Sequence, residues 1–126
     1  MKPIVKLMID IYNLDGIDFM GYTVSKDNPY TFHHLIKRCH GGKETIENGA
    51  ILTKDAHEYL HLIETRDLKL YEYINNVLMQ INEQCFEPLR RQLLAIDFLL
   101  KLFEEQHSED LTCKKELIIK KKYLRR

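Results

Sequence analysis

Residues 30–64 of this chain read YTFHHLIKRCHGGKETIENGAILTKDAHEYLHLIE. Residues 30–36 combine aromatic and β-branched side chains, which predicts a strand. The loop that follows contains Gly41 and Gly42, and the freedom of glycine to adopt positive φ suits a tight reversal. Residues 48–52 predict a second short strand. The quoted stretch therefore begins as two strands joined by a loop.

A helix is expected to follow the second strand at once. Thr53 suits the N-cap position, and Asp55 places a negative charge in the first turn, where it interacts favourably with the helix dipole. From residue 54 to about residue 65 the apolar and histidine positions recur at offsets of three and four. His57 and His61 are four residues apart and therefore share one face of this helix.

The histidines of this unit have a spacing that suits metal binding. Residues adjacent on a strand point to opposite faces, so one of His33 and His34 can join a metal ion while the other faces a substrate or another group. Two imidazoles at i and i+4 of a helix commonly bind one divalent ion. His33, His57 and His61 could then form a site with open positions for water and a phosphate oxygen. His34 is left as a titratable group suited to general-base catalysis near neutral pH.

These residues together resemble the HNH endonuclease superfamily, whose fold is the ββα-metal unit. The resemblance rests on the double histidine, the Gly-containing loop, Asn48 before an apolar strand, and the H-x-x-x-H pair on the helix. It covers residues 31–64, roughly a quarter of the chain, and the double histidine with the H-x-x-x-H pair is most similar to the colicin-type DNase version of the site.

The resemblance implies a role for each motif residue. His34 would be the general base that activates the attacking water. His33, where many members have Asp, would be a metal ligand together with His57 and His61. Asn48 would be counted with His34 among the catalytic residues, but its role would be structural, because its side chain would bond to backbone across the loop. The implied reaction is metal-dependent hydrolysis of a DNA phosphodiester that leaves a 5′ phosphate, with the metal acting as Lewis acid and template.

Two features adjoin the motif. Lys37 and Arg38 directly follow the first strand and either contact phosphate or are ordinary solvated residues.

Many members of the HNH superfamily carry a four-cysteine zinc site, which this chain lacks, because its three cysteines (Cys39, Cys85 and Cys113) are far apart. We expect the C-terminal helices to replace that support by packing. A site with three imidazoles favours Zn, Ni or Mn over Mg, which prefers oxygen ligands.

The rest of the chain predicts an α+β protein, with a small ββα-metal unit in residues 19–65 and a helical extension in residues 67–126 of a single domain, 1–126. Residues 4–12 suit a helix or a strand, and residues 19–24 are rich in aromatic and β-branched side chains. Apolar stripes with a three-to-four residue spacing follow residue 67, and Pro88 suits the first position of a helix. The stripes are expected to form the hydrophobic core. The alternative is that they bind a partner, with a homo-oligomer formed through the C-terminal helices.

Charge is unevenly distributed along the chain. Residues 53–112 carry six basic and twelve acidic side chains, whereas residues 113–126 carry seven basic and one acidic. This basic tail is either a nucleic-acid arm or a solvated segment that pairs with the acidic middle. No apolar run reaches the roughly 20 residues of a membrane span, and no signal peptide is evident. A cytoplasmic protein is expected.

The leading functional hypothesis is therefore an HNH-type endonuclease from a bacterium or phage that acts on DNA with a divalent metal ion (Zn, Ni, Mn or Mg). The alternative is a catalytically inactive HNH-fold module that binds nucleic acid or protein. A purely structural metal site in a helical interaction domain is the third interpretation. Nothing in the sequence distinguishes DNA from RNA as the target.

Overall fold

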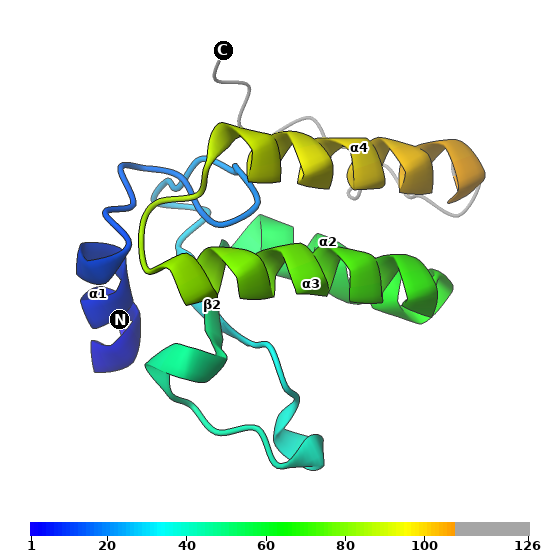
Figure 1. Cartoon of the computed structure of the whole chain (residues 1–126). Helices are drawn as coiled ribbons and strands as arrows, with labels where there is room; N and C mark the ends of the chain where they lie inside the picture. The colour runs from blue at the N-terminus through cyan, green and yellow to red at the C-terminus, as the bar shows by residue number, and fades with distance from the viewer. Residues whose placement is uncertain (108–126) are drawn as a thin grey trace.

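The structure of the protein is a computed structural model that describes residues 1–107. Its α-helices and a two-stranded antiparallel sheet confirm the expected α+β class (Figure 1). The elements in chain order are α1 (Pro3–Ile11), β1 (Tyr30–His34), the 3-10 turns η1 (Arg38–His40) and η2 (Ile46–Asn48), β2 (Gly49–Thr53), α2 (Lys54–Arg66), α3 (Leu68–Gln84) and α4 (Arg90–His107). The basic tail, 113–126, lies outside the described residues.

The sheet and α2 form the expected strand, loop, strand and helix. β1 pairs with β2 in a register that sets Phe32 opposite Ile51. The hydroxyl of Thr53 accepts the N–H of Ala56 at 3.3 Å, so Thr53 is the N-cap of α2, as predicted. Buried Asp18 holds the junction of β2 with α2, because its Oδ2 accepts the N–H of Thr53 at 2.7 Å.

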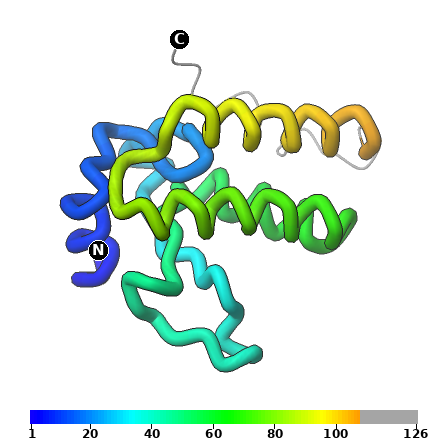
Figure 2. Tube along the Cα trace, viewed as in Figure 1, coloured from blue at the N-terminus to red at the C-terminus, as the bar shows by residue number. Residues whose placement is uncertain are grey.

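α2 and α3 pack onto the sheet, and α4 packs onto α3. α3 lies against α2, and α4 returns antiparallel along α3, so that α3 and α4 form a helical hairpin (Figures 1 and 2). Asp67 caps α3 by accepting the N–H of Leu70 at 3.2 Å. The apolar stripes are buried in one continuous core, to which α3 and α4 contribute Leu70, Tyr71, Ile74, Leu78, Ile81, Ile96, Leu100 and Phe103.

Three local expectations are decided by packing. Residues 3–11 form a helix because Val5 and Met8, three residues apart, both enter the core. Residues 19–24 form a loop held by Asp18 rather than a longer strand. α4 begins at Arg90 rather than at Pro88, because the side chain of Gln92 accepts the N–H of Leu89 and closes the helix start there.

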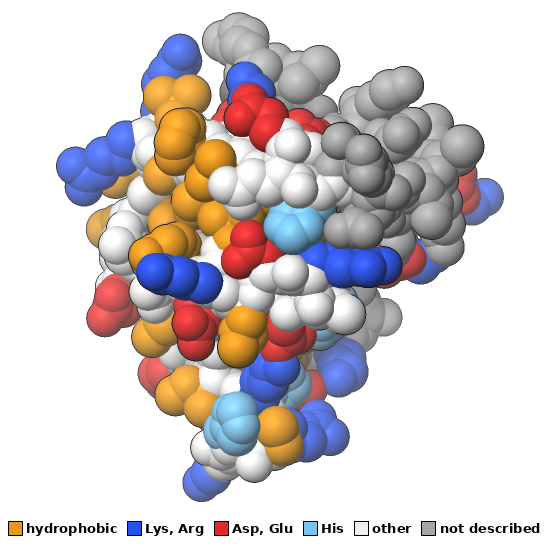
Figure 3. Space-filling view, turned by 90° about the vertical axis from the view of Figure 1, so that its right-hand side faces the viewer, with side chains coloured by type: hydrophobic (Ala, Val, Ile, Leu, Met, Phe, Trp, Pro, Cys, Tyr) orange, Lys and Arg blue, Asp and Glu red, His pale blue; other side chains and the backbone are white. Residues whose placement is uncertain are grey.

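Large apolar side chains remain exposed on the helical hairpin. About half or more of the surface is exposed for Tyr73 of α3 (49%) and for Leu94 (53%) and Phe98 (65%) of α4. Figure 3, which views the molecule from the right-hand side of Figure 1, shows hydrophobic side chains gathered on one side of the visible face. Self-association through these helices stays a prediction. No helix within residues 1–107 is both long and apolar enough to cross a membrane.

Asn82 ties α3 to the sheet and to α1. Its Nδ2 donates to the carbonyls of Ile46 at 2.7 Å and Gly49 at 2.6 Å. The backbone carbonyl of Asn82 accepts the hydroxyl of Tyr12, the residue that follows α1, at 2.8 Å. The Asn82 side chain is buried, so the two carbonyls it satisfies have little access to water.

We expect Asn82→Ala to lower the free energy of unfolding by about 2–4 kcal/mol, because two buried acceptors lose their donor. Asn76→Ala is the matched control, since Asn76 lies on the same helix and is exposed; it should change stability by no more than about 0.5 kcal/mol. Urea denaturation followed by circular dichroism measures both. Equal stabilities of the two variants would contradict the role given to Asn82.

Candidate metal centre

The three predicted metal ligands lie in a row. The ring of His33, on β1, meets the ring of His57, on α2, edge to face at a centroid distance of 5.4 Å. The ring of His57 stacks on that of His61, one turn further along α2, at 4.8 Å. The row runs from a buried end to an exposed one, because His33 is 3% exposed and the His61 side chain 58%.

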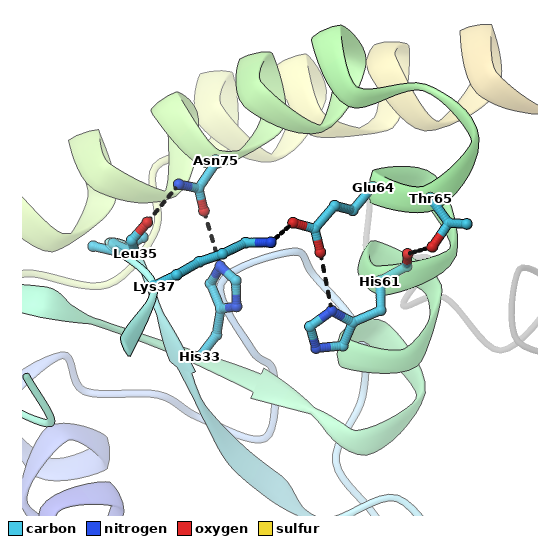
Figure 4. Close-up of polar contacts among 7 residues, drawn as sticks. All are labelled: His33, Leu35, Lys37, His61, Glu64, Thr65 and Asn75. Atoms are coloured by element: carbon cyan, nitrogen blue, oxygen red, sulfur yellow. Dashed lines mark hydrogen bonds and ion pairs between the residues drawn. The ribbon is translucent and has the colours of Figure 1, made fainter. Parts of the chain in front are cut away.

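Asn75 of α3 fixes the proton on His33. The amide Nδ2 of Asn75 donates to the carbonyl of Leu35 at 3.0 Å, so its Oδ1 faces Nε2 of His33 at 2.9 Å (Figure 4). Because this oxygen only accepts, Nε2 of His33 must carry the hydrogen. Burial lowers the pKa of His33 to about 4, so the ring is neutral at pH 7. The lone pair of His33 is therefore on Nδ1.

Thr31 fixes the proton on His57 in a similar way. The hydroxyl of Thr31 donates its one hydrogen to the carbonyl of Leu52 at 2.8 Å. Nδ1 of His57 lies 2.9 Å from the same hydroxyl oxygen, so it must donate to it. Burial lowers the pKa of His57 to about 4, with the neighbouring His33 adding to the effect. His57 is thus neutral at pH 7 and has its lone pair on Nε2.

His61 has a different environment at the exposed end of the row. Its Nδ1 lies 3.4 Å from the carboxylate of Glu64, and the same carboxylate pairs with the ammonium of Lys37. Burial, followed by the charge of Lys37, lowers the pKa of His61. Figure 4 shows Lys37 reaching from the end of β1 toward Glu64 on α2.

The two predicted nucleic-acid contacts, Lys37 and Arg38, have different environments, because only Lys37 takes part in this ion pair. The ammonium of Lys37 lies 5.8 Å from the ring centroid of Tyr71, in addition to its pairing with Glu64. Arg38 begins η1 and is exposed to solvent. Lys37 is tied to the histidine row, because its partner Glu64 also approaches His61.

The donor atoms suit a metal ion, although the full ligand set is not assembled. Two imidazoles on one tetrahedral ion at about 2.1 Å hold their ring centroids roughly 5 Å apart, and those of His33 and His57 are 5.4 Å apart. Within residues 1–107, however, no group of three or more His, Cys, Asp or Glu is arranged to hold a metal ion. The stacked ring of His61 faces Glu64 instead, and as an exposed side chain it can rotate.

His34 lies on the opposite face of β1 from His33, as expected for adjacent strand residues. Its ring meets the edge of Phe32, two residues earlier, at a centroid distance of 4.9 Å. Nε2 of His34 is buried and has no hydrogen-bond partner in the described part of the chain. Buried polar atoms without a partner are rare, so this one requires an explanation.

Asn48 closes the loop between the strands. Its Oδ1 accepts the N–H of Ile36 at 2.7 Å, and its Nδ2 donates to the carbonyls of Ile36 and Lys43 at 2.9 Å. These are bonds to backbone across the loop, of the kind that the resemblance implies. Gly42 is required beside them, because a Cβ there would lie 1.7 Å from the carbonyl oxygen of Ile36. Asn48 thus holds the chain immediately after His34.

Sequence reasoning missed the residues that orient the imidazoles. Thr31 was recoverable, since it is two residues before His33 and so on the same face of the strand. Asn75 was not, because it lies on α3, outside the motif. Glu64 falls one turn after His61, a spacing that allows a contact without requiring one. His107, the last residue of α4, is partly buried and stacks on Phe103 at a centroid distance of 4.6 Å.

Comparison of the chain with models of known protein families, with curated proteins and with solved structures finds no match.

We expect His33 and His57 to stay neutral from pH 8 to about pH 5, with opposite tautomers. His33 should carry its hydrogen on Nε2 and His57 on Nδ1, because Asn75 and Thr31 accept these hydrogens. Long-range proton–nitrogen correlation spectra of the metal-free protein distinguish the two forms. A shared tautomer, or titration of either ring near pH 6.5, would refute the assignment.

The same pKa values make stability depend on pH. Both folded-state values, about 4, lie below the ordinary 6.5, so the unfolded chain binds more protons between these limits. The stabilisation is complete above pH 6.5 and is lost as the pH falls toward 4, at up to about 2.7 kcal/mol per pH unit for the pair. Urea midpoints measured at several pH values should show this slope. His57→Asn should remove about half of it, and an unchanged slope would count against burial of a neutral His57.

Proposed function

We propose that this protein is a metal-dependent endonuclease of the HNH type that hydrolyses phosphodiester bonds in DNA. One observation carries the proposal. Two neutral imidazoles lie side by side, and an oxygen acceptor fixes the N–H of each ring, which leaves the lone pair on the other ring nitrogen. Metal-binding histidines typically donate their second N–H to an oxygen acceptor, which orients the ring and raises its basicity. Asn75 and Thr31 provide such acceptors for His33 and His57.

The metal would be held by His33 through Nδ1 and by His57 through Nε2, with His61 as the third ligand after rotation of its exposed ring. When bound, a divalent ion supplies Lewis-acid stabilisation of the charge that develops on the phosphate. An all-imidazole donor set favours Zn, Ni or Mn over Mg. Rotation of His61 would separate it from Glu64 and leave that carboxylate to Lys37 alone.

His34 is proposed as the general base. Its Nε2, buried and without a partner in the described residues, is the atom that would accept the proton of an attacking water. Because that atom is covered by protein and His34 lies on the opposite face of β1 from His33, the ring would have to turn around the end of β1, which is at His34, when substrate binds. Asn48 has a positioning role, since it anchors the backbone directly after His34 through Ile36.

The charges around the site favour an anionic substrate on one side only. Lys37 is directed toward the histidine row and Arg38 is exposed nearby, so both can contact phosphate groups. Residues 53–112 carry a net negative charge, which repels a polyanion from much of the remaining surface. The basic tail, 113–126, adds positive charge from outside the described residues.

A plasmid-nicking assay with Zn, Ni, Mn and Mg tests the proposal. Wild type should nick supercoiled DNA only with a divalent metal, and His34→Ala should reduce the rate by about 100-fold or more while the protein stays folded. His57→Ala should also weaken metal binding in calorimetry. His40→Ala is the matched control, since His40 is exposed in the loop and should leave the rate unchanged.

Undiminished nicking by folded His34→Ala would remove His34 as the base. Salt-dependent DNA binding by wild type without cleavage in any of the metals would replace the endonuclease by the inactive binding module, the alternative that the sequence left open.

A further inference from the structure

A pocket of about 610 Å³ lies along the outer edge of β1, beside the histidine row. It is formed by the N-terminal residues and α1, by residues 29–32 and by His57. Thr31 and Phe32, whose side chains point to opposite faces of β1, both line it, as expected for a pocket at the open edge of the strand. His57 therefore belongs to two surfaces, because its ring also contacts His33 in the candidate metal centre.

The sheet register sends to this outer edge the backbone groups of β1 that do not bond to β2. In an antiparallel pair, every second residue bonds to the partner strand. Lys54 donates to the carbonyl of Pro29 at 2.8 Å and Leu35 to that of Asn48 at 2.9 Å, which assigns the odd-numbered residues of β1 to β2. The N–H and C=O groups of Tyr30 and Phe32 consequently point away from β2, along the edge that the pocket follows.

We infer that this pocket binds a single unstacked nucleobase next to the phosphodiester that is cleaved, an inference that rests on the proposed function. A base has two apolar faces and a polar edge. The pocket offers apolar walls from Val5, Pro29 and the rings of Tyr30 and Phe32, and donors and acceptors from the strand edge.

The position of the pocket relates it to the cleavage site. A nucleotide bound beside His57 would have its sugar and phosphate directed at the candidate metal centre. Lys2 also lines the pocket and, although paired with Glu44 at 2.8 Å, adds a positive charge at the same side. The volume lies within the range of small-molecule sites, about 300–1,000 Å³.

A pocket for an unstacked base implies a preference for unpaired DNA over paired duplex. A base in a regular duplex is stacked and paired, and it reaches a pocket of this kind only by leaving the stack. The protein should therefore cleave single-stranded or locally unpaired DNA at least about tenfold faster than a fully paired duplex of the same sequence.

Binding is tested on the full, metal-free chain with dAMP as the probe and deoxyribose 5-phosphate, which lacks the base, as its control. Amide proton–nitrogen spectra should show shifts of Tyr30 and Phe32 with dAMP and none with the sugar phosphate at equal concentration. Tyr30→Leu should weaken dAMP binding about tenfold, whereas Tyr30→Phe, which keeps the ring, should stay within about twofold.

The outcomes separate the inference from the proposed function. Metal-dependent nicking without dAMP binding overturns the base pocket and leaves the endonuclease intact. Binding of dAMP at Tyr30 and Phe32 without nicking in any metal supports the pocket and overturns the endonuclease. Protection of the same amides by an extended tetrapeptide, with no effect of dAMP, would show a strand-addition edge and overturn the inference.

Discussion

The antiparallel pairing of β1 with β2 is the constraint on which the site depends. Its register sets His33 opposite Ala50, and the side chains of β1 then alternate between two faces. Thr31 and His33 face α2 and α3, where they meet His57 and Asn75. A slip of one residue would exchange these two with Phe32 and His34 and disperse the row of imidazoles.

The helical extension contributes chemistry as well as packing. α3 supplies Asn75, which selects the tautomer of His33, and Asn82, which ties the same helix to the start of β2. A buried neutral imidazole with one fixed N–H is a better metal ligand than a solvated one, because protons compete less for its lone pair and its orientation is set in advance. α3 therefore packs against the sheet and also orients a candidate metal ligand.

The ion pair of Lys37 with Glu64 balances charge over the row. The ammonium of Lys37 opposes protonation of His61 and His33, and the carboxylate of Glu64 compensates that charge. A phosphate arriving at the site would compete with Glu64 for Lys37. Lys37 therefore adds to the effect of burial on His33 and His61, and under the proposed function its charge would also be available to a phosphate of the substrate.

The sequence by itself determined the ββα unit, its helix cap at Thr53 and the shared face of His57 and His61, because strand alternation, capping and helical period are local properties. The tertiary structure alone decided which nitrogen of each imidazole is free, since Asn75 is 42 residues from His33 in sequence. It also decided that residues 3–11 form a helix and that a pocket borders the open edge of β1. Such properties depend on contacts between distant segments, which no local pattern contains.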